Sequence, residues 1–306
     1  KVVGGKPIDF RVAVLPTVFG EKIVLRVLDK SSILLRLNDL GYDGETLNKY
    51  QDAFMRPNGA ILVTGPTGSG KSTTLYATLN VLNDETKNII TVEDPVEYRL
   101  AGINQIQVNP KAGLTFSSAL RSILRTSPDI IMVGEIRDLE TAQIAIESAL
   151  TGHLVFSTLH TNDAPGAITR LTEMGIEPFL TASGIVCVLA QRLARRLCTC
   201  KVRYEPPPEL LKRLEFDLEE GDGTVFYKPN PQGCARCGGT GYKGRIALTE
   251  IMRMSPEIEQ LTIEEASTAE IKRVAIEQGM KTMRQDGWDK VRQGTTAIEE
   301  VLRVVI

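Results

Sequence analysis

A run of small and polar residues has the composition of a phosphate-binding loop. It fits the pattern G-x-x-x-x-G-K-[ST] at every fixed position and consists of Gly65, Pro66, Thr67, Gly68, Ser69, Gly70, Lys71 and Ser72. Glycines let backbone N–H groups approach phosphate oxygens, the ammonium of Lys71 can reach the β- and γ-phosphates, and the hydroxyl of Ser72 can ligate Mg²⁺. An apolar run, 60–63, precedes the loop, and good helix formers continue from Thr73 to about Asn83, so a helix N-terminus would point at the same anion. The sequence therefore predicts a nucleoside triphosphate site built from residues 65–73.

Two groups of acidic residues follow apolar runs of strand length, where acids would lie beside a phosphate loop. Glu135 ends the segment 129–135, which has the layout of a Walker B segment, and we expect it to contact Mg²⁺ through water. In the segment 91–98, a carboxylate could act as base or orienting acceptor for the water that attacks the γ-phosphate. Spacing alone does not choose between Glu93 and Glu97. Either group could instead be a solvated strand end or a structural turn.

Four basic side chains are further candidates for contact with the phosphates. The two histidines, His153 and His160, stand at opposite ends of the apolar run 154–158. A neutral imidazole can both donate and accept hydrogen bonds, so His160 is a candidate γ-phosphate sensor, and His153 at the other strand end is the weaker candidate. Arg11 and Arg26 lie on predicted strands outside the nucleotide-binding part. They are either ordinary solvated side chains or arginines from a second domain that stabilise the transferring phosphoryl group.

Four of the five cysteines form two tight pairs, which favours a metal site over disulfides. The pairs are Cys198 with Cys200 and Cys234 with Cys237. A Cys-x-x-Cys pair followed by glycines is the usual half of a Zn²⁺ site, whose tetrahedral shell takes four thiolates. The Cys-x-Cys pair is a less usual half-site with a narrower bite, and unligated thiols are the alternative. We expect Cys187 to be buried in an apolar run.

The elements that must position these residues alternate between apolar strands and helices from about residue 44. This alternation predicts an α/β fold with a parallel sheet and helices on both faces. The core strands are predicted at 60–63, 88–92, 130–133 and 154–158. Helical spacing groups Phe116, Ala119, Leu120, Ile123 and Leu124 on one face, and Ala142, Ala145, Ile146, Ala149 and Leu150 on another.

Other segments differ from this alternating pattern. Residues 1 to about 28 are predicted as strands, because apolar and polar residues alternate there. We expect Asp163 to be the N-cap, and Gly175 the C-terminal stop, of one further helix. Prolines, glycines and cysteines interrupt the pattern over 198–244, and helix is predicted again after Thr249.

The composition bounds the class of protein. The 306 residues are enough for two domains, and the apolar fraction of 42% with a charged fraction of 24% is typical of a globular protein. A net charge of −2 supplies no basic field for nucleic acid. No apolar run approaches the length needed to cross a bilayer, and no signal peptide is visible. Because Lys1 begins inside an alternating strand pattern, we expect the chain to start within a domain.

Taken together, these segments resemble the secretion ATPases that assemble type IV pili and drive type II secretion. The Walker A segment of that family looks like GPTGSGKSTTLYATL, its Asp box is similar to TVEDPVEY, its Walker B segment to LRTSPDIIMVGEIRD, and its His box to TGHLVFSTLHTNDA. The domain before the motor ends in a segment that resembles FRVAVLPTVFGEKIVLRVLD, and the closing helices resemble MKTMRQDGWDKVRQGTTAIEEVLRV. The match covers essentially the whole chain, without the family's earlier N-terminal domains.

The resemblance implies a role for each matching residue. It implies catalytic roles for Lys71, Glu97, Glu135, His160, Arg11 and Arg26. Ser72 becomes the Mg²⁺ contact, and Glu97 is selected over Glu93 as the general base. The two arginines would close over the γ-phosphate. The cysteine pairs look like the zinc knuckle of the extension and secretion branches, which retraction motors lack, although the family usually has Cys-x-x-Cys where this chain has Cys198-x-Cys200.

The same resemblance implies an organisation and partners. Residues 1–30 would be the C-terminal part of an N-terminal PAS-like α+β domain, 31–43 a linker, and 44–306 a RecA-like ATPase domain with a cysteine-rich metal-binding insertion at 198–244. The implied cofactors are ATP, Mg²⁺ and Zn²⁺. The implied assembly is a cytoplasmic homohexamer, held at the inner membrane through a platform protein and not inserted in the bilayer itself.

Several functions remain open at this stage. We favour an ATPase that powers type IV pilus assembly over one that drives the pseudopilus of type II secretion. A RecA-like nucleic-acid translocase would need basic grooves or stacking aromatics, and aromatic residues make up only 5% of the chain. A catalytically silent, ATP-gated scaffold is the remaining alternative, although every catalytic position is filled.

Overall fold

The computed structural model describes residues 2–3, 6–29, 36–216 and 223–305. The strands are β1 (Val2–Val3), β2 (Lys6–Thr17), β3 (Gly20–Asp29), β4 (Gly59–Thr64), β5 (Ile89–Glu93), β6 (Asn104–Gln107), β7 (Ile130–Val133), β8 (Leu154–Leu159), β9 (Ile185–Leu197), β10 (Val202–Arg203), β11 (Tyr227–Lys228) and β12 (Tyr242–Arg253). The α-helices are α1 (Gly44–Phe54), α2 (Lys71–Leu82), α3 (Phe116–Ile123), α4 (Leu139–Leu150), α5 (Pro165–Glu173), α6 (Pro178–Gly184), α7 (Pro208–Arg213), α8 (Pro256–Ile263), α9 (Thr268–Glu277), α10 (Met283–Arg292) and α11 (Ile298–Val305). Single 3₁₀ turns are η1 (Leu37–Asp39), η2 (Pro110–Ala112), η3 (Leu124–Thr126) and η4 (Ala235–Cys237).

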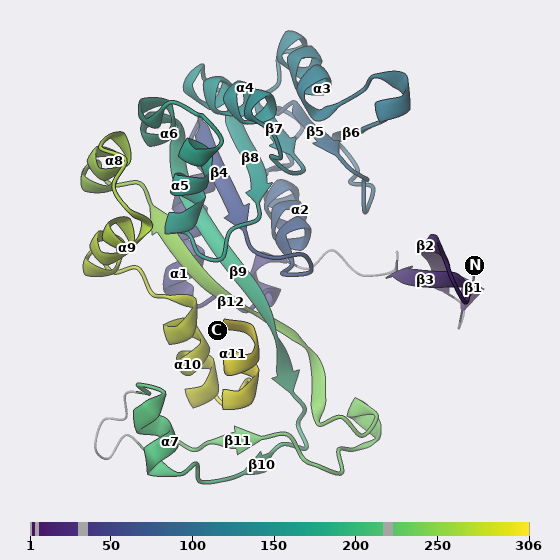
Figure 1. Cartoon of the computed structure of the whole chain (residues 1–306), viewed down its shortest axis with the longest axis vertical. Helices are drawn as coiled ribbons and strands as arrows, with labels where there is room; N and C mark the ends of the chain where they lie inside the picture. The colour runs from purple at the N-terminus through teal and green to yellow at the C-terminus, as the bar shows by residue number, and fades with distance from the viewer. Residues whose placement is uncertain (1, 4–5, 30–35, 217–222, 306) are drawn as a thin grey trace.

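A seven-stranded sheet forms the centre of the fold, with the strand order β12-β9-β4-β8-β7-β5-β6 (Figure 1). Every neighbouring pair is parallel except β12 with β9. The strands β4, β5, β7 and β8 are buried along their whole length, which explains why each is a continuous apolar run rather than an alternating one. Parallel neighbours need crossover connections, so the helices lie on both faces of the sheet.

Two apolar cores cover the two faces of this sheet. Successive side chains of a strand point to opposite faces, so Leu62 belongs to one core and Ile61 to the other. The Leu62 core includes residues of α3, α4, α5, α8 and α9. The Ile61 core includes residues of α1 and of α2, the helix that follows the phosphate loop. The helix with the phosphate-binding residues is therefore packed directly on the sheet.

The strands β9 and β12 continue past the sheet as a long two-stranded ribbon (Figure 1). A third apolar core, which includes Leu248 and Trp288, joins this ribbon to residues of α7, α10 and α11. A buried ion pair also fixes α10 to β12: Asp286 pairs with Lys290 at 2.5 Å and accepts a hydrogen bond from the backbone of Thr249 at 2.7 Å. The C-terminal helices are thereby held against strands of the central sheet.

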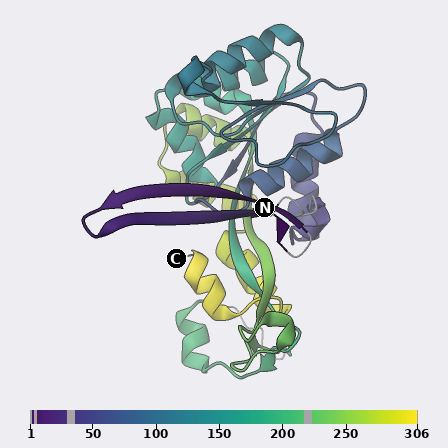
Figure 2. The same cartoon turned by 90° about the vertical axis from the view of Figure 1, so that its right-hand side faces the viewer.

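The N-terminal strands β2 and β3 form an antiparallel hairpin, which Figure 2 shows as a long ribbon. The register pairs Arg11 with Arg26 across the hairpin. The side chains of these two arginines lie outside the described part of the chain, as do residues 31–35 of the predicted linker. Large apolar side chains of the hairpin are exposed, with Val12 at 54% and Leu25 at 59% of their surface.

The sequence predictions for the core strands are confirmed to within one residue at each end. The predicted parallel sheet is confirmed for the core strands, and the exception is β12, which runs antiparallel to β9 at one edge. The prediction of helix directly after Thr249 is wrong, since β12 continues to Arg253 and α8 begins at Pro256. This error arose because β9 and β12, which supply one side of the sheet, were not predicted as strands.

Smaller predictions about helices had mixed outcomes. Leu150 was grouped with a buried face but is 39% exposed at the end of α4. The assigned N-cap of α5 is Ala164 rather than Asp163, although the Asp163 carboxylate does accept a hydrogen bond from Gly166 N at 3.0 Å. Gly175 follows the C-cap with φ +94°, as predicted for a helix stop. Each helix in the described ranges is too short or too polar to cross a lipid bilayer.

Candidate active site

Four loops meet at the carboxyl ends of neighbouring parallel strands, where ligands of open α/β sheets bind. The phosphate loop follows β4, His160 follows β8, Glu135 lies just beyond β7, and the loop with Glu97 follows β5. These loops line one cavity of about 750 Å³, whose walls include Lys71 and Ser72. The fold thus brings together five residues that the sequence analysis selected from four separate segments.

The phosphate loop has the backbone shape that its glycines predict. Gly65 has φ +143°, and a Cβ at this position would lie 2.3 Å from the carbonyl oxygen of Gln191, so only glycine fits. Gly70, also left-handed, is the N-cap of α2. The ammonium of Lys71 donates to the carbonyl oxygens of Gly65 at 2.8 Å and Pro66 at 3.1 Å. Burial lowers the pKa of Lys71, and the nearby Glu135 opposes that shift. The lysine therefore lies within the loop, facing the cavity.

Glu135 is the centre of a charged group opposite the phosphate loop. Its carboxylate pairs with the Arg137 guanidinium and lies 3.4 Å from Nε2 of His160. Arg137 is also 4.0 Å from Asp94. The Glu135 side chain is only 16% exposed, whereas His160 is about half exposed. A carboxylate, a guanidinium and an imidazole that border one cavity of about 750 Å³ can together bind a metal–nucleotide complex.

The loop that carries His160 is fixed to the strand before the phosphate loop. The backbone N–H of Thr161 donates to Oγ1 of Thr64 at 2.9 Å, and their hydroxyls lie 2.6 Å apart. His153, by contrast, lies at the amino end of β8, where Nδ1 contacts the carbonyl oxygen of Ser148 at 3.0 Å. It does not line the cavity, which agrees with its ranking as the weaker candidate.

The structure distinguishes the two carboxylates that sequence spacing left equivalent. Glu93 is 4% exposed and accepts hydrogen bonds from Tyr76, from Thr91 at 2.6 Å and from Gln105 at 3.1 Å. Its oxygens are occupied by neighbouring side chains. Glu97 also lines the cavity, and among the described residues its carboxylate has no hydrogen-bond or ion-pair partner. Of the two, Glu97 is the one whose carboxylate oxygens are not taken up by side-chain donors in the described part of the chain.

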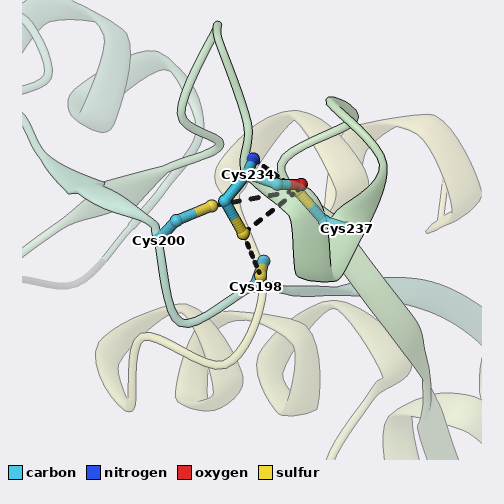
Figure 3. A group of neighbouring side chains, drawn as sticks. All are labelled: Cys198, Cys200, Cys234 and Cys237. Carbon is cyan, nitrogen blue, oxygen red and sulfur yellow. Dashed lines mark hydrogen bonds between the residues drawn. The ribbon is translucent and has the colours of Figure 1, made fainter.

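The four predicted ligand cysteines lie together, away from this cavity. Their sulfur atoms are all within 4.8 Å of one another, in a group that could bind a metal ion. Figure 3 shows the side chains of the two pairs converging from separate segments. The distances between Cys198 and Cys234 (3.7 Å), Cys200 and Cys237 (3.9 Å), and Cys234 and Cys237 (3.8 Å) match the edge of about 3.8 Å that a tetrahedron with Zn–S bonds of about 2.3 Å requires.

Cys237 of this group has donors that stabilise its thiolate, whereas burial and the neighbouring thiols raise the pKa of Cys200 to about 12. Burial alone would raise the pKa of the Cys237 thiol. Hydrogen bonds from the backbone N–H groups of Cys234 at 3.1 Å and Gly241 at 3.3 Å, and from neighbouring thiols, outweigh this effect and lower the pKa to about 6. A thiolate is the form that binds metal. The sulfurs of the Cys-x-Cys pair lie within 4.8 Å of those of Cys234 and Cys237 despite the narrower spacing of that pair.

Sequence reasoning missed one residue that supports the phosphate loop from beneath. Gln191 on β9 is 1% exposed, and its Nε2 donates to the carbonyl oxygen of Ser69 at 2.8 Å. Its Oε1 accepts from Thr74 at 2.8 Å and from Tyr42 at 3.2 Å. The available signal was a single amide side chain within the otherwise apolar run that begins at Ile185. Arg137, the partner of Glu135, was missed as well.

Comparison with known proteins gives the family. Residues 1–303 match the family described as "Type II/IV secretion system protein". The chain belongs to this family. It is 53% identical over 300 residues to the type IV pilus assembly ATPase PilB of Thermus thermophilus, covering 98% of this chain and 34% of that protein. It is 49% identical over 303 residues to the type II secretion system ATPase E of Vibrio cholerae, covering 99% of this chain and 59% of that protein.

A solved structure agrees with this assignment. The pilus retraction motor PilT with bound ADP matches with a TM-score of 0.68 and 28% identity, over 96% of this chain and 73% of that one. The ATPase DotB of Yersinia pseudotuberculosis, at 22% identity and a TM-score of 0.70, shares the fold. The chain spans between 34% and 53% of the length of the first three curated relatives that it matches.

Proposed function

We propose that this chain is the motor part of an ATPase that hydrolyses ATP to power type IV pilus assembly. The observation that carries the proposal is the meeting of Lys71, Glu97, Glu135 and His160 in one cavity. The chain's relatives bear the names of pilus assembly and secretion ATPases, and membership of their family supports that cavity as the nucleotide site. A nucleic-acid translocase receives no support from any of these relatives.

Hydrolysis would proceed by attack of water on the γ-phosphorus. As the new oxygen–phosphorus bond forms, the bond to the bridging oxygen breaks and ADP leaves with its electrons, while the Glu97 carboxylate takes the proton of the water. Lys71 and the N-terminus of α2 stabilise the negative charge on the phosphates. The Ser72 hydroxyl and the Glu135 carboxylate border the same cavity and are oxygen donors of the kind that suits Mg²⁺. When bound, Mg²⁺ neutralises charge on the phosphate oxygens.

The remaining predicted roles belong to the same proposal. Arg11 and Arg26 would reach the γ-phosphate from the N-terminal domain, which would explain a pair of arginines in register on one hairpin. The exposed apolar side chains of that hairpin, such as Val12, support its being the end (1–30) of a larger PAS-like domain, joined by the linker 31–43 to the ATPase domain 44–306. The insertion 198–244 would hold a structural Zn²⁺ through its four cysteines.

We further propose that the motor works as a homohexamer on the cytoplasmic side of the inner membrane, coupled to a membrane platform protein. Closure of the N-terminal domain over bound ATP would be the power step, because contacts made only in the closed state shift a domain equilibrium. Type II secretion is the second candidate, since the relative from V. cholerae is nearly as similar as the PilB protein.

The test is steady-state ATP hydrolysis with Mg²⁺ as a function of protein concentration. We expect turnover per chain to rise with concentration for the wild type, and to be lost in Glu97→Gln and in Arg26→Ala. Turnover that is independent of concentration and survives Arg26→Ala would instead mean that each nucleotide domain works alone. Complementation of strains that lack either the pilus assembly or the secretion ATPase separates the two candidate functions.

A further inference from the structure

The buried hydroxyl of Tyr76 joins the phosphate-binding helix to the loop that carries Glu97. Tyr76 lies on α2, less than two turns after Lys71, and is 1% exposed. Its hydroxyl donates to Oε2 of Glu93 and accepts from the backbone N–H of Glu97 at 3.1 Å. Burial, followed by the bond to Glu93, raises the pKa of Tyr76, so the hydroxyl stays protonated and remains a donor.

A second side chain holds the same loop from the opposite direction. Nε2 of Gln105 on β6 donates to Oε1 of Glu93 at 3.1 Å and to the carbonyl oxygen of Tyr98 at 3.0 Å. Oε1 of Gln105 accepts from the backbone N–H of Leu100 at 2.7 Å. The buried carboxylate of Glu93 is therefore the common point of a network that holds the loop backbone at Glu97, through Tyr76, and directly after it, through Gln105.

Packing alone does not account for this tyrosine. A phenylalanine would fill the same space and would keep the edge-on contact between the rings of residue 76 and Tyr98, whose centroids are 5.7 Å apart. It would, however, leave the backbone N–H of Glu97 and one oxygen of Glu93 without the partner that they have now. The hydroxyl thus determines where the loop backbone lies relative to α2.

We propose that Tyr76 is a positioning residue for ATP hydrolysis, which holds the Glu97 loop at a set distance from the helix that carries Lys71 and Ser72. The inference rests on the proposed function, in which Glu97 is the general base. Tyr76 lines the cavity, but its hydroxyl is bonded to Glu93 and to the backbone of Glu97. We therefore expect loss of the hydroxyl to act on the placement of the base and not on nucleotide affinity. A base displaced by about 1 Å can lower the rate by about a hundredfold.

The first experiment compares Tyr76→Phe with the wild type in ATP hydrolysis. We expect kcat to fall by about ten- to a hundredfold while KM, and the affinity for a fluorescent ATP analogue, stay unchanged. Tyr50→Phe is the matched control. Tyr50 is also fully buried, and its hydroxyl contacts Thr78 of the same helix at 2.9 Å, but it does not touch the Glu97 loop. Its kcat should be that of the wild type.

A double-mutant cycle separates positioning from general structural damage. If Tyr76 acts through Glu97, Tyr76→Phe should cause no further loss of the slow residual single-turnover rate of a Glu97→Gln protein, followed over hours. An equal further loss in that background would overturn the inference. A wild-type kcat in Tyr76→Phe, with Glu97→Gln inactive, would also overturn the inference about Tyr76. Wild-type activity of Glu97→Gln would instead overturn the assignment of Glu97 as the base.

Gln105→Leu gives a second variant in case Tyr76→Phe does not fold. Gln105 is only partly buried and holds the same loop through Tyr98 and Leu100. Reduced kcat with unchanged KM in Gln105→Leu supports the positioning network. Wild-type kcat in this variant would contradict it.

Discussion

Replacing Gln191 by leucine should weaken both the fold around the phosphate loop and the binding of nucleotide. Leucine has a similar volume, so the change removes hydrogen bonds from a fully buried site without opening a large cavity. The lost bonds are those to Ser69, Thr74 and Tyr42.

The magnitude follows from which partners are left unpaired. The hydroxyls of Tyr42 and Thr74 still lie 2.7 Å from each other, so these two groups keep a partner. The Ser69 carbonyl loses the bond from Gln191 in a residue that is 3% exposed. One buried acceptor without its partner costs about 1–3 kcal/mol of unfolding free energy. If about 1 kcal/mol of this appears as loss of loop order, the Kd for nucleotide rises about fivefold.

Urea unfolding and titration with a fluorescent ATP analogue measure the two effects. Tyr42→Phe is the control, because it removes a hydroxyl from the same group and leaves the bond to Ser69 intact. It should lower stability slightly and leave nucleotide affinity unchanged. Unchanged unfolding free energy and unchanged affinity in Gln191→Leu would refute the reasoning.

Three further predictions concern parts of the chain outside the nucleotide site. Asp286→Ala should lower the unfolding free energy measured in urea by about 3–5 kcal/mol, because Lys290 is left as an unpaired buried charge. A loss in Asp286→Ala that is smaller than the loss in the double variant Asp286→Leu, Lys290→Met would contradict this prediction. Burial raises the pKa of Glu300, but hydrogen bonds from two arginines outweigh this effect and lower the pKa from 4.5 to about 2. The contribution of Glu300 to the unfolding free energy is therefore present above about pH 4.5 and is lost as the pH falls towards 2. Glu300→Gln should flatten that part of a stability–pH curve, and an unaltered slope would count against the prediction. Chelation of metal, or Cys234→Ser, should lower the Tm of the protein, and about one zinc per chain should be measured before chelation. An unchanged Tm would contradict this prediction.

Features set by local chemistry were predictable from the sequence. A loop that wraps phosphates needs glycines with positive φ at fixed spacing, and Gly65 and Gly70 have the conformations that this requires. Strands buried on both faces must be continuously apolar, so β4, β7 and β8 were found with nearly correct ends. The grouping of the four cysteines also followed from spacing, because Cys-x-x-Cys already defines half a site.

Features set by distant neighbours were not predictable in this way. The difference between Glu93 and Glu97 depends on Tyr76 and Gln105, which approach from a helix and an edge strand. Gln191 is a buried amide whose partners come from the phosphate loop and α2, and its place at the end of an apolar run does not reveal those partners. The long strands β9 and β12 were missed because their ends leave the sheet and enter a polar, glycine-rich segment that resembles loop.

The most direct test of the central claim follows the fate of ATP on the protein. Radiolabelled ATP is mixed with excess Glu97→Gln or wild-type protein and Mg²⁺, the reaction is stopped with acid, and the bound nucleotide is identified. We expect Glu97→Gln to bind ATP with wild-type affinity and to retain it as ATP, whereas the wild type converts it to ADP. Conversion to ADP by Glu97→Gln at the wild-type rate would contradict the assignment of the base and, with it, the proposed mechanism.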